Sequence, residues 1–167
     1  MVGDYNHYAA RMLTTTDQGL ERFQRAMAGL FRHGTLQRLH DHVASRAGIE
    51  CERAGFLVMR RVVSEGPIRV TDLARDLGLD PSTISRHLRA VEARDWVRRV
   101  PDLDDRRAAL VTATKSGERV VALLETERRR VLATVLAGWD QTDRDALFDL
   151  TERFAADLSD HVQHHLT

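Results

Sequence analysis

The sequence predicts a mainly α-helical fold with one small β-hairpin, and two observations lead to this prediction. Apolar residues recur at three- and four-residue spacings over most of the chain, which is the period of an amphipathic helix. Two short stretches at 97–100 and 108–112 are typical of strands, and the polar loop between them has hairpin length. Together they indicate helices packed around one core that carries a two-stranded β wing.

On the N-terminal side of the hairpin, residues 17–46 carry an apolar stripe typical of a long helix, which we expect to bend at Gly34. A second helix is predicted over residues 51–64, because Gly66 and Pro67 end the pattern.

On its C-terminal side, Thr114 is expected to cap a helix that runs to about residue 138. A last helix is predicted to start at Thr142, where Asp145 would complete a capping box.

The stretch just before the hairpin predicts a helix-turn-helix. Residues 68–70 form a short extended piece, Thr71 is expected to cap a short helix, and Gly78 supplies the tight turn after it. Asp80 then caps a second helix, and Pro81 occupies the first turn, where a missing N–H costs nothing. In such a motif the second helix enters the DNA major groove.

This second helix has two different faces. At about 100° per residue, Ile84, Leu88 and Val91 share one sector, so we expect them to pack on the preceding helices. Small hydroxyl residues and arginines face the other way, and they can reach base edges and phosphates. The predicted DNA-binding residues of this helix are Ser82, Thr83, Ser85, Arg86 and Arg89. An ordinary solvated helix face is the alternative.

The hairpin loop places basic residues beside that helix. Arg106 and Arg107 are predicted to reach a neighbouring minor groove, whose negative potential favours arginine. Asp104 and Asp105 are expected to stabilise the wing by pairing with one of these arginines. A plain charged turn is the alternative, and the adjacent helix-turn-helix favours the wing.

Composition excludes several classes of protein. The net charge is zero, but residues 51–115 carry 13 basic and 10 acidic side chains, a mild local excess that fits a DNA-facing surface. The chain has no long apolar run or secretory signal and only one cysteine, so we expect a cytoplasmic protein without a membrane span or disulfides. No nucleophile motif, phosphate loop or paired catalytic carboxylate is present, which predicts no enzyme activity and no cofactor.

The central part resembles the MarR (multiple antibiotic resistance regulator) family of bacterial winged helix-turn-helix repressors. The resemblance covers residues 49 to about 120 without gaps. Two departures lie at the ends of the wing: Asp95 replaces the usual glycine before Trp96, and Ala113 replaces the usual leucine before Thr114. The matching motifs are Thr71-Asp-Leu-Ala-Arg-Asp-Leu-Gly78, Ser82-Thr-Ile-Ser-Arg-His-Leu88, Val91-Glu-Ala-Arg-Asp-Trp-Val97, Asp102-Leu-Asp-Asp-Arg-Arg107 and Thr114-Lys-Ser-Gly117.

This resemblance implies an obligate dimer with interlocked terminal helices, an inverted-repeat operator, and a ligand pocket between the dimerisation and DNA-binding parts. The residues also favour a dimer, because the terminal helices carry long apolar stripes that one chain has few places to bury. We therefore divide the chain into an N-terminal arm (1–16), a dimerisation helix (17–50), a winged helix-turn-helix domain (51–113) and C-terminal dimerisation helices (114–167).

The predicted function is a homodimeric DNA-binding transcriptional regulator, most simply a repressor, that binds a pseudo-palindromic duplex site. The resemblance suggests a small lipophilic or phenolic effector, and Phe23, Met27, Phe31, Phe56 and Met59 are candidates for lining its pocket, with plain core packing as the alternative.

Two other classes of function stay open. A winged-helix module that binds another protein is one of them. A redox- or metal-responsive regulator is the other: Cys51 begins a helix near Arg53, a setting that can lower a thiol pKa. Histidines cluster at His33, His40 and His42 and at His161, His164 and His165. Exposed histidines on helix surfaces are the simpler interpretation, and no metal site is predicted.

Overall fold

The computed structural model describes residues 17–102, 105 and 109–165. The chain divides into two compact units, residues 1–125 and 126–167, and both are mainly helical, as the sequence predicted. Within the described residues, no helix combines the length and apolar character needed to cross a membrane.

The long helix predicted at the N-terminal end is in fact two helices, α2 (Asp17–Leu30) and α3 (His33–Ala47). The prediction of a bend at Gly34 was therefore wrong: the chain breaks two residues earlier, where the backbone of Arg32 is not helical (φ −55°, ψ 124°). Gly29 and Gly34 flank the break. Because glycine has a low helix propensity, both residues raise the free-energy cost of one continuous helix through this region.

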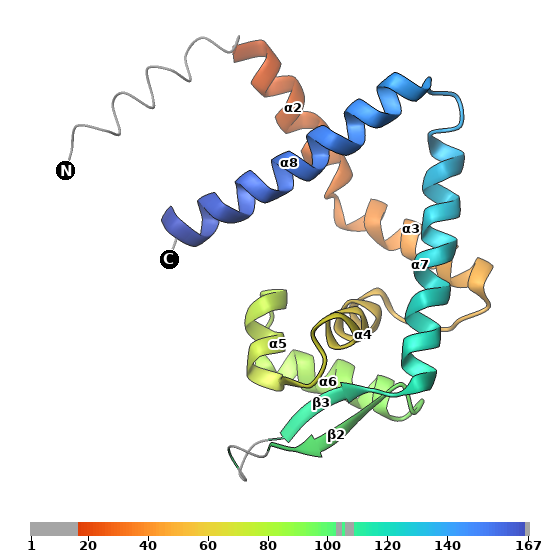
Figure 1. Ribbon diagram of the computed structural model, residues 1–167, viewed down its shortest axis with the longest axis vertical. Coiled ribbons are helices and arrows are strands. Elements are labelled where there is room, and N and C mark those ends of the chain that lie inside the picture. The colour runs from red at the N-terminus through yellow and green to blue at the C-terminus, as the bar shows by residue number, and fades with distance from the viewer. Residues whose placement is uncertain (1–16, 103–104, 106–108, 166–167) are drawn as a thin grey trace, which may run out of the picture. The chain divides into compact units, whose positions relative to one another are not determined.

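Three helices form the core of the first unit, α4 (Arg53–Glu65), α5 (Val70–Leu77) and α6 (Pro81–Glu92). They pack against one another, and both α4 and α5 contact the strand β3 (Figure 1). Each helix packs its apolar face into this core, and the removal of those apolar side chains from water stabilises the unit. The fully buried side chains of these three helices and of β3 are Phe56, Val58, Met59 and Val62 of α4, Leu73 of α5, Ile84 and Leu88 of α6, and Val111 of β3.

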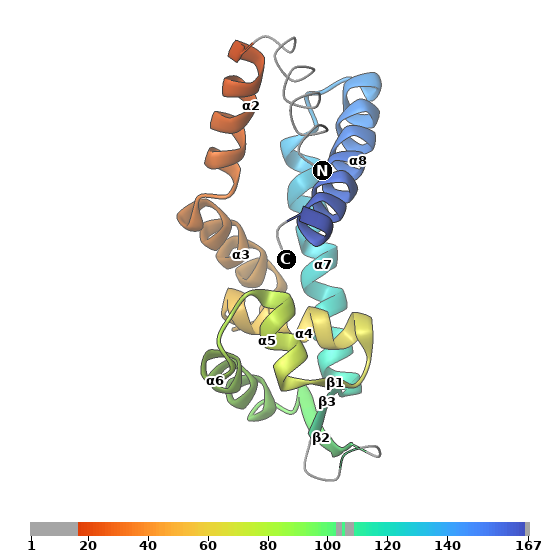
Figure 2. The ribbon, with the colours of Figure 1, turned by 90° about the vertical axis from the view of Figure 1, so that its left-hand side faces the viewer.

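The sheet has three antiparallel strands, β1 (Ile68–Arg69), β2 (Val97–Pro101) and β3 (Ala109–Ala113), in the order β1-β3-β2. The predicted hairpin is confirmed, with Val97 opposite Ala113 and Pro101 opposite Ala109. The prediction of only two strands was incomplete, because the extended piece before α5 pairs with β3 through Ile68 and Arg69 (Figure 2).

The remaining helices are α7 (Lys115–Val135) and α8 (Gln141–His165). Thr114 caps α7 as predicted, because its hydroxyl oxygen accepts a hydrogen bond from the backbone N–H of Gly117 at 3.1 Å. The prediction that Thr142 begins the last helix was wrong. Asp140 is the capping side chain, and it accepts a hydrogen bond from the backbone N–H of Asp143 at 2.8 Å.

The second unit leaves much of its apolar surface uncovered within one chain. Its part of α7 and the facing side of α8 line a largely apolar groove of about 750 Å³ that includes Leu132, Leu136 and Phe148. Phe148 and Leu150 of α8 are 52% and 55% exposed. A contiguous apolar surface of this kind marks an interaction site in a folded protein.

Candidate nucleic-acid interface

The turn between α5 and α6 is the predicted helix-turn-helix turn. Gly78 ends α5 in the left-handed conformation, with φ of 62°, and its N–H bonds to the carbonyl of Arg75. This confirms the role expected of a glycine at that point. The prediction that Thr71 caps α5 was wrong, because the helix begins one residue earlier at Val70 and no side chain caps it.

Asp80 holds the first turn of α6 together, as predicted. Its carboxylate accepts hydrogen bonds from the backbone N–H of Thr83 at 2.9 Å, the hydroxyl of Thr83 at 2.6 Å and the hydroxyl of Ser82 at 2.5 Å. These hydrogen bonds favour the charged form and hold the pKa of Asp80 well below its ordinary value, with the Ser82 hydroxyl making the largest contribution. The carboxylate also interacts favourably with the N-terminal end of the helix dipole.

The two faces of α6 are arranged as the sequence predicted. Ile84, Leu88 and Val91 are buried in the core. The side chains of Ser82, Arg86 and Arg89 are exposed, and those of Thr83 and Ser85 are half-buried at the flanks. Two arginine side chains therefore extend from the outer face of α6, while its inner face is buried in the core.

The hydrogen bonds to Asp80 limit what two of these residues can offer to DNA. Because Ser82 and Thr83 already donate their hydroxyl protons to the carboxylate, only their oxygen lone pairs remain. Lone pairs can accept from base amino groups but cannot donate to phosphate oxygens. Donation to phosphates or to guanine is thus left mainly to Arg86 and Arg89, which carry up to five N–H donors each.

The base of the wing is held by an ion pair that the sequence did not reveal. Arg69 of β1 donates two hydrogen bonds to one carboxylate oxygen of Asp102, at 2.8 and 2.6 Å. The other Asp102 oxygen accepts from the backbone N–H of Asp105 at 3.3 Å. Asp102 is buried, so this carboxylate fixes the start of the wing loop to β1.

No local signal points to this pair, because 33 residues separate the two partners. Of the residues predicted to serve the wing, Asp105 is exposed. Asp104, Arg106 and Arg107 lie outside the described residues, and their roles stay predictions. Arg98 of β2 is a further exposed arginine that the sequence analysis did not select.

The other end of the wing is fixed to α7 by a close backbone contact. A Cβ atom added to Gly117 would lie 1.9 Å from the carbonyl oxygen of Trp96, so only glycine fits at this position. Asp95 adopts φ of 55°, the left-handed conformation that glycine adopts most easily and that aspartate tolerates. The backbone carbonyl of Asp95 accepts the hydroxyl proton of Thr114 at 2.6 Å.

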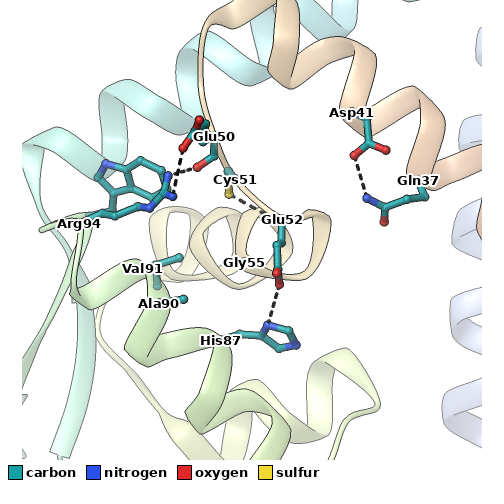
Figure 3. A pocket seen from close by; sticks show the side chains of 11 residues that line it. Gln37, Asp41, Glu50, Cys51, Glu52, Gly55, His87, Ala90, Val91 and Arg94 are labelled. Atoms are coloured by element: carbon teal, nitrogen blue, oxygen red, sulfur yellow. Dashed lines mark hydrogen bonds and ion pairs between the residues drawn. The ribbon is translucent and has the colours of Figure 1, made fainter.

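The structure separates the five candidate effector-pocket residues. Phe56 and Met59 of α4 are fully buried in the core, whereas Phe23 of α2 and Phe31 after it are 43% and 65% exposed, and Met27 is half-buried. A second pocket, beside α6, has a volume of about 340 Å³ and is lined partly by residues of α3, α4 and α6 (Figure 3). Neither this pocket nor the groove of the second unit contains any of the five residues. Their role in effector binding stays a prediction.

The structure gives little support to a redox or metal switch. Burial raises the pKa of the Cys51 thiol to about 11, against a smaller lowering by Arg94, so the thiol stays protonated at neutral pH. His40 is buried and donates from Nε2 to the Cys51 carbonyl at 2.7 Å. Among the described residues, no group of three or more His, Cys, Asp or Glu side chains is arranged to hold a metal ion.

Comparison with known proteins agrees with this geometry. The model of the MarR family matches residues 52–109. The HTH-type transcriptional regulator YxaD of Bacillus subtilis is 32% identical over 113 residues, which cover 68% of this chain and 78% of the relative. YdgJ of the same organism, also an HTH-type transcriptional regulator, is 26% identical over 112 residues, or 67% of each chain.

Solved structures share the fold at low sequence identity. A MarR family protein from Bacillus stearothermophilus superposes with a TM-score of 0.71 at 19% identity, covering 86% of this chain and 96% of its own. The protein RV1404 from Mycobacterium tuberculosis gives a TM-score of 0.70 at 21% identity, covering 86% and 95%.

Proposed function

The chain belongs to the MarR family of transcriptional regulators, which are not enzymes, and on this premise we propose that it is a homodimeric repressor that binds a pseudo-palindromic operator. We further propose that it acts in the cytoplasm, and that a small-molecule effector releases it from DNA. The observation that carries the proposal is the outer face of α6, where Arg86 and Arg89 are exposed opposite a fully buried apolar stripe.

This face fits a DNA groove chemically. Arginine can donate two parallel hydrogen bonds to a guanine edge, and it pairs equally well with phosphate. The rigid attachment of α6 through Ile84 and Leu88 supports the proposal, because a helix must be held in place to read bases. Arg106 and Arg107 of the wing are proposed to contact the adjacent minor groove.

Uncovered apolar surface supports a dimer. Leu20 and Leu30 of α2 are 54% and 61% exposed, and the exposed residues of α8 add to them. A second copy that covers these helices removes apolar surface from water on both chains. We therefore assign residues 17–50 and 114–167 to dimerisation, and two-fold symmetry then presents two copies of α6 to half-sites about one helical turn apart.

Repression follows from occupancy of a promoter, and release follows from an effector that favours another spacing of the two α6 helices. A lipophilic or phenolic effector stays an expectation from the family resemblance.

The direct test uses a duplex selected from a random pool by the wild-type protein. Arg86→Ala is expected to lose about 1–3 kcal/mol of affinity for this duplex and much less for random DNA, if the arginine donates to a base. Fluorescence anisotropy on both duplexes measures the difference, and Arg60→Ala, which removes an exposed arginine of α4, is the matched control. Equal losses on the two duplexes would show that Arg86 only contacts phosphate.

A salt titration separates this function from that of a protein-interaction module. Binding to a duplex through several phosphate contacts must weaken steeply as salt rises. Absence of duplex binding at low salt would refute the proposed function, and analytical ultracentrifugation of the same samples tests the dimer.

A further inference from the structure

An ion pair joins the end of α6 to the wing. Nε of Arg99 donates a hydrogen bond to a carboxylate oxygen of Glu92 at 2.9 Å. Glu92 is the last residue of α6, and Arg99 is the middle residue of β2. Hydrogen bonds between charged groups are stronger than those between neutral groups. The side chains of Glu92 and Arg99 are 24% and 42% exposed, so salt screens this pair less than a pair on an open surface.

The ion pair holds one strand of the hairpin, and the core holds the other. Arg99 of the edge strand β2 pairs with Val111 of β3. Val111 is fully buried, and β3 contacts α4 and α5. β2 contacts α6, which it follows directly in the chain (Figure 1). At this position of the ladder, the two strands are therefore attached to different helices.

Two attachments on neighbouring strands fix the rotation of the hairpin about its long axis. Without the ion pair, β2 is able to move away from α6 while β3 stays in the core. The carboxyl end of β2 is tied to the opposite edge of the sheet, where Asp102 accepts hydrogen bonds from Arg69 of β1. The orientation of the wing relative to α6 therefore depends on Glu92 and Arg99.

This orientation matters for DNA binding, a step that rests on the proposed function. α6 carries Arg86 and Arg89 on its outer face, and β2 leads into the loop that we propose to contact the minor groove. The duplex fixes the separation of its two grooves. A helix in the major groove and a wing at the adjacent minor groove therefore bind together only if the protein holds them at that separation.

We propose that Glu92 and Arg99 are positioning residues for DNA recognition. Their ion pair sets the orientation of the wing relative to α6, and through it the preference for A·T base pairs beside each half-site. Such base pairs narrow the minor groove and strengthen its negative potential, which favours arginine. Neither Glu92 nor Arg99 needs to touch DNA for this role.

The readout is a ratio of two affinities. Two duplexes share the half-sites of the selected duplex and differ only in the flanking base pairs, which are A·T in one and G·C in the other. Fluorescence anisotropy gives the ratio of their affinities, which we call the flank preference. Partial unfolding of a variant lowers binding to both duplexes equally, so a loss of stability alone leaves this ratio unchanged.

Two single variants separate positioning from the effect of charge. Glu92→Gln removes a negative charge and should strengthen binding to any duplex, whereas Arg99→Gln removes a positive charge and should weaken it. Both variants break the same ion pair. We therefore expect opposite changes in overall affinity and the same loss of flank preference, about two- to fivefold. A duplex with a replaced half-site guanine reports on α6, and discrimination against it should stay unchanged.

Each variant has a matched control. Asp76→Asn breaks the ion pair with Arg61 that joins α4 to α5 at 2.6 Å with similar exposure, and it should leave the flank preference unchanged. Arg98→Gln removes the exposed arginine next to Arg99, on the opposite face of β2, and should weaken binding to both duplexes equally. Combining Glu92→Arg with Arg99→Glu keeps the net charge and rebuilds the pair in reverse, so it should restore most of the flank preference.

Several results would overturn the positioning role. These are a wild type without flank preference, an unchanged preference in both single variants, or changes of opposite sign that follow the removed charge. A loss in Arg98→Gln as large as that in Arg99→Gln, or no recovery in the reversed pair, would overturn it as well. Absence of duplex binding by the wild type would refute the proposed function together with this inference, whereas binding with an unaltered flank preference would refute the inference alone.

Discussion

Replacing Gly117 by alanine tests how the wing is joined to α7. The added Cβ would lie 1.9 Å from the carbonyl oxygen of Trp96, 2.8 Å from its carbonyl carbon and 3.2 Å from its Cα. All three atoms belong to the backbone, so no side-chain rotation relieves the overlap, and α7 must move away from the start of β2 by about 1 Å or more.

This movement also weakens the capping contacts at the same place. Thr114 donates its backbone N–H to the Trp96 carbonyl at 3.0 Å, and its hydroxyl oxygen accepts the Gly117 N–H at 3.1 Å. Overpacking typically costs about 1–3 kcal/mol, and loss of a helix cap costs about 1 kcal/mol. We therefore expect Gly117→Ala to lower the free energy of unfolding by about 2–4 kcal/mol.

Urea unfolding at fixed protein concentration measures this loss. With a urea dependence of about 2 kcal/mol per molar, the midpoint should fall by about 1–2 M. Gly19→Ala in α2 is the matched control, because nothing lies within 4 Å of the Cβ it adds and alanine favours helix. The reasoning is refuted if Gly117→Ala is as stable as the wild type, or if the control is destabilised as much.

Three further predictions concern the turn, the wing and the cysteine. Asp80→Ala should lower the urea midpoint at pH 7. Because folding depresses the pKa of Asp80, its carboxylate stabilises the fold above the ordinary pKa of 3.8, and this stabilisation is lost as the pH falls below that value. The urea midpoints of the variant and the wild type should therefore converge in acid. A constant difference down to pH 2 would contradict this. Asp102→Asn should weaken DNA binding, because the wing loses the ion pair that positions it. Adding Arg69→Ala to this variant should weaken binding little further, since both changes remove the same ion pair. Fully additive losses of binding free energy in anisotropy titrations would show that the pair is not the cause. Cys51 should react with iodoacetamide only as the pH approaches about 11, which mass spectrometry of the labelled protein measures. Rapid labelling at pH 7 would restore the redox hypothesis.

Local sequence patterns were sufficient to predict α6 and its two faces. The Asp80–Pro81 pair, the glycine at 78 and the spacing of Ile84 and Leu88 each act within a few residues, and capping and helical periodicity are local effects. The structure places all of them as predicted. Capping failed as a signal at Thr71, because α5 begins at Val70 without any side-chain cap, and at Thr142, because Asp140 caps α8 instead.

Contacts between distant residues were beyond the reach of such patterns. The Arg69–Asp102 pair joins residues 33 positions apart, and β1 pairs with β3 across α5 and α6. The pocket beside α6 likewise joins α3, the connection after it and α6, and no sequence spacing brings those side chains together.

The sequence by itself determined which helix presents arginines to its surroundings and how that helix begins, since periodicity and capping depend on neighbouring residues alone. The tertiary structure decided why Gly117 must be glycine, how Asp95 adopts a conformation typical of glycine, and which carboxylate lies beside His87. Those features depend on the close approach of segments far apart in the chain, and packing at that distance is set by the fold as a whole.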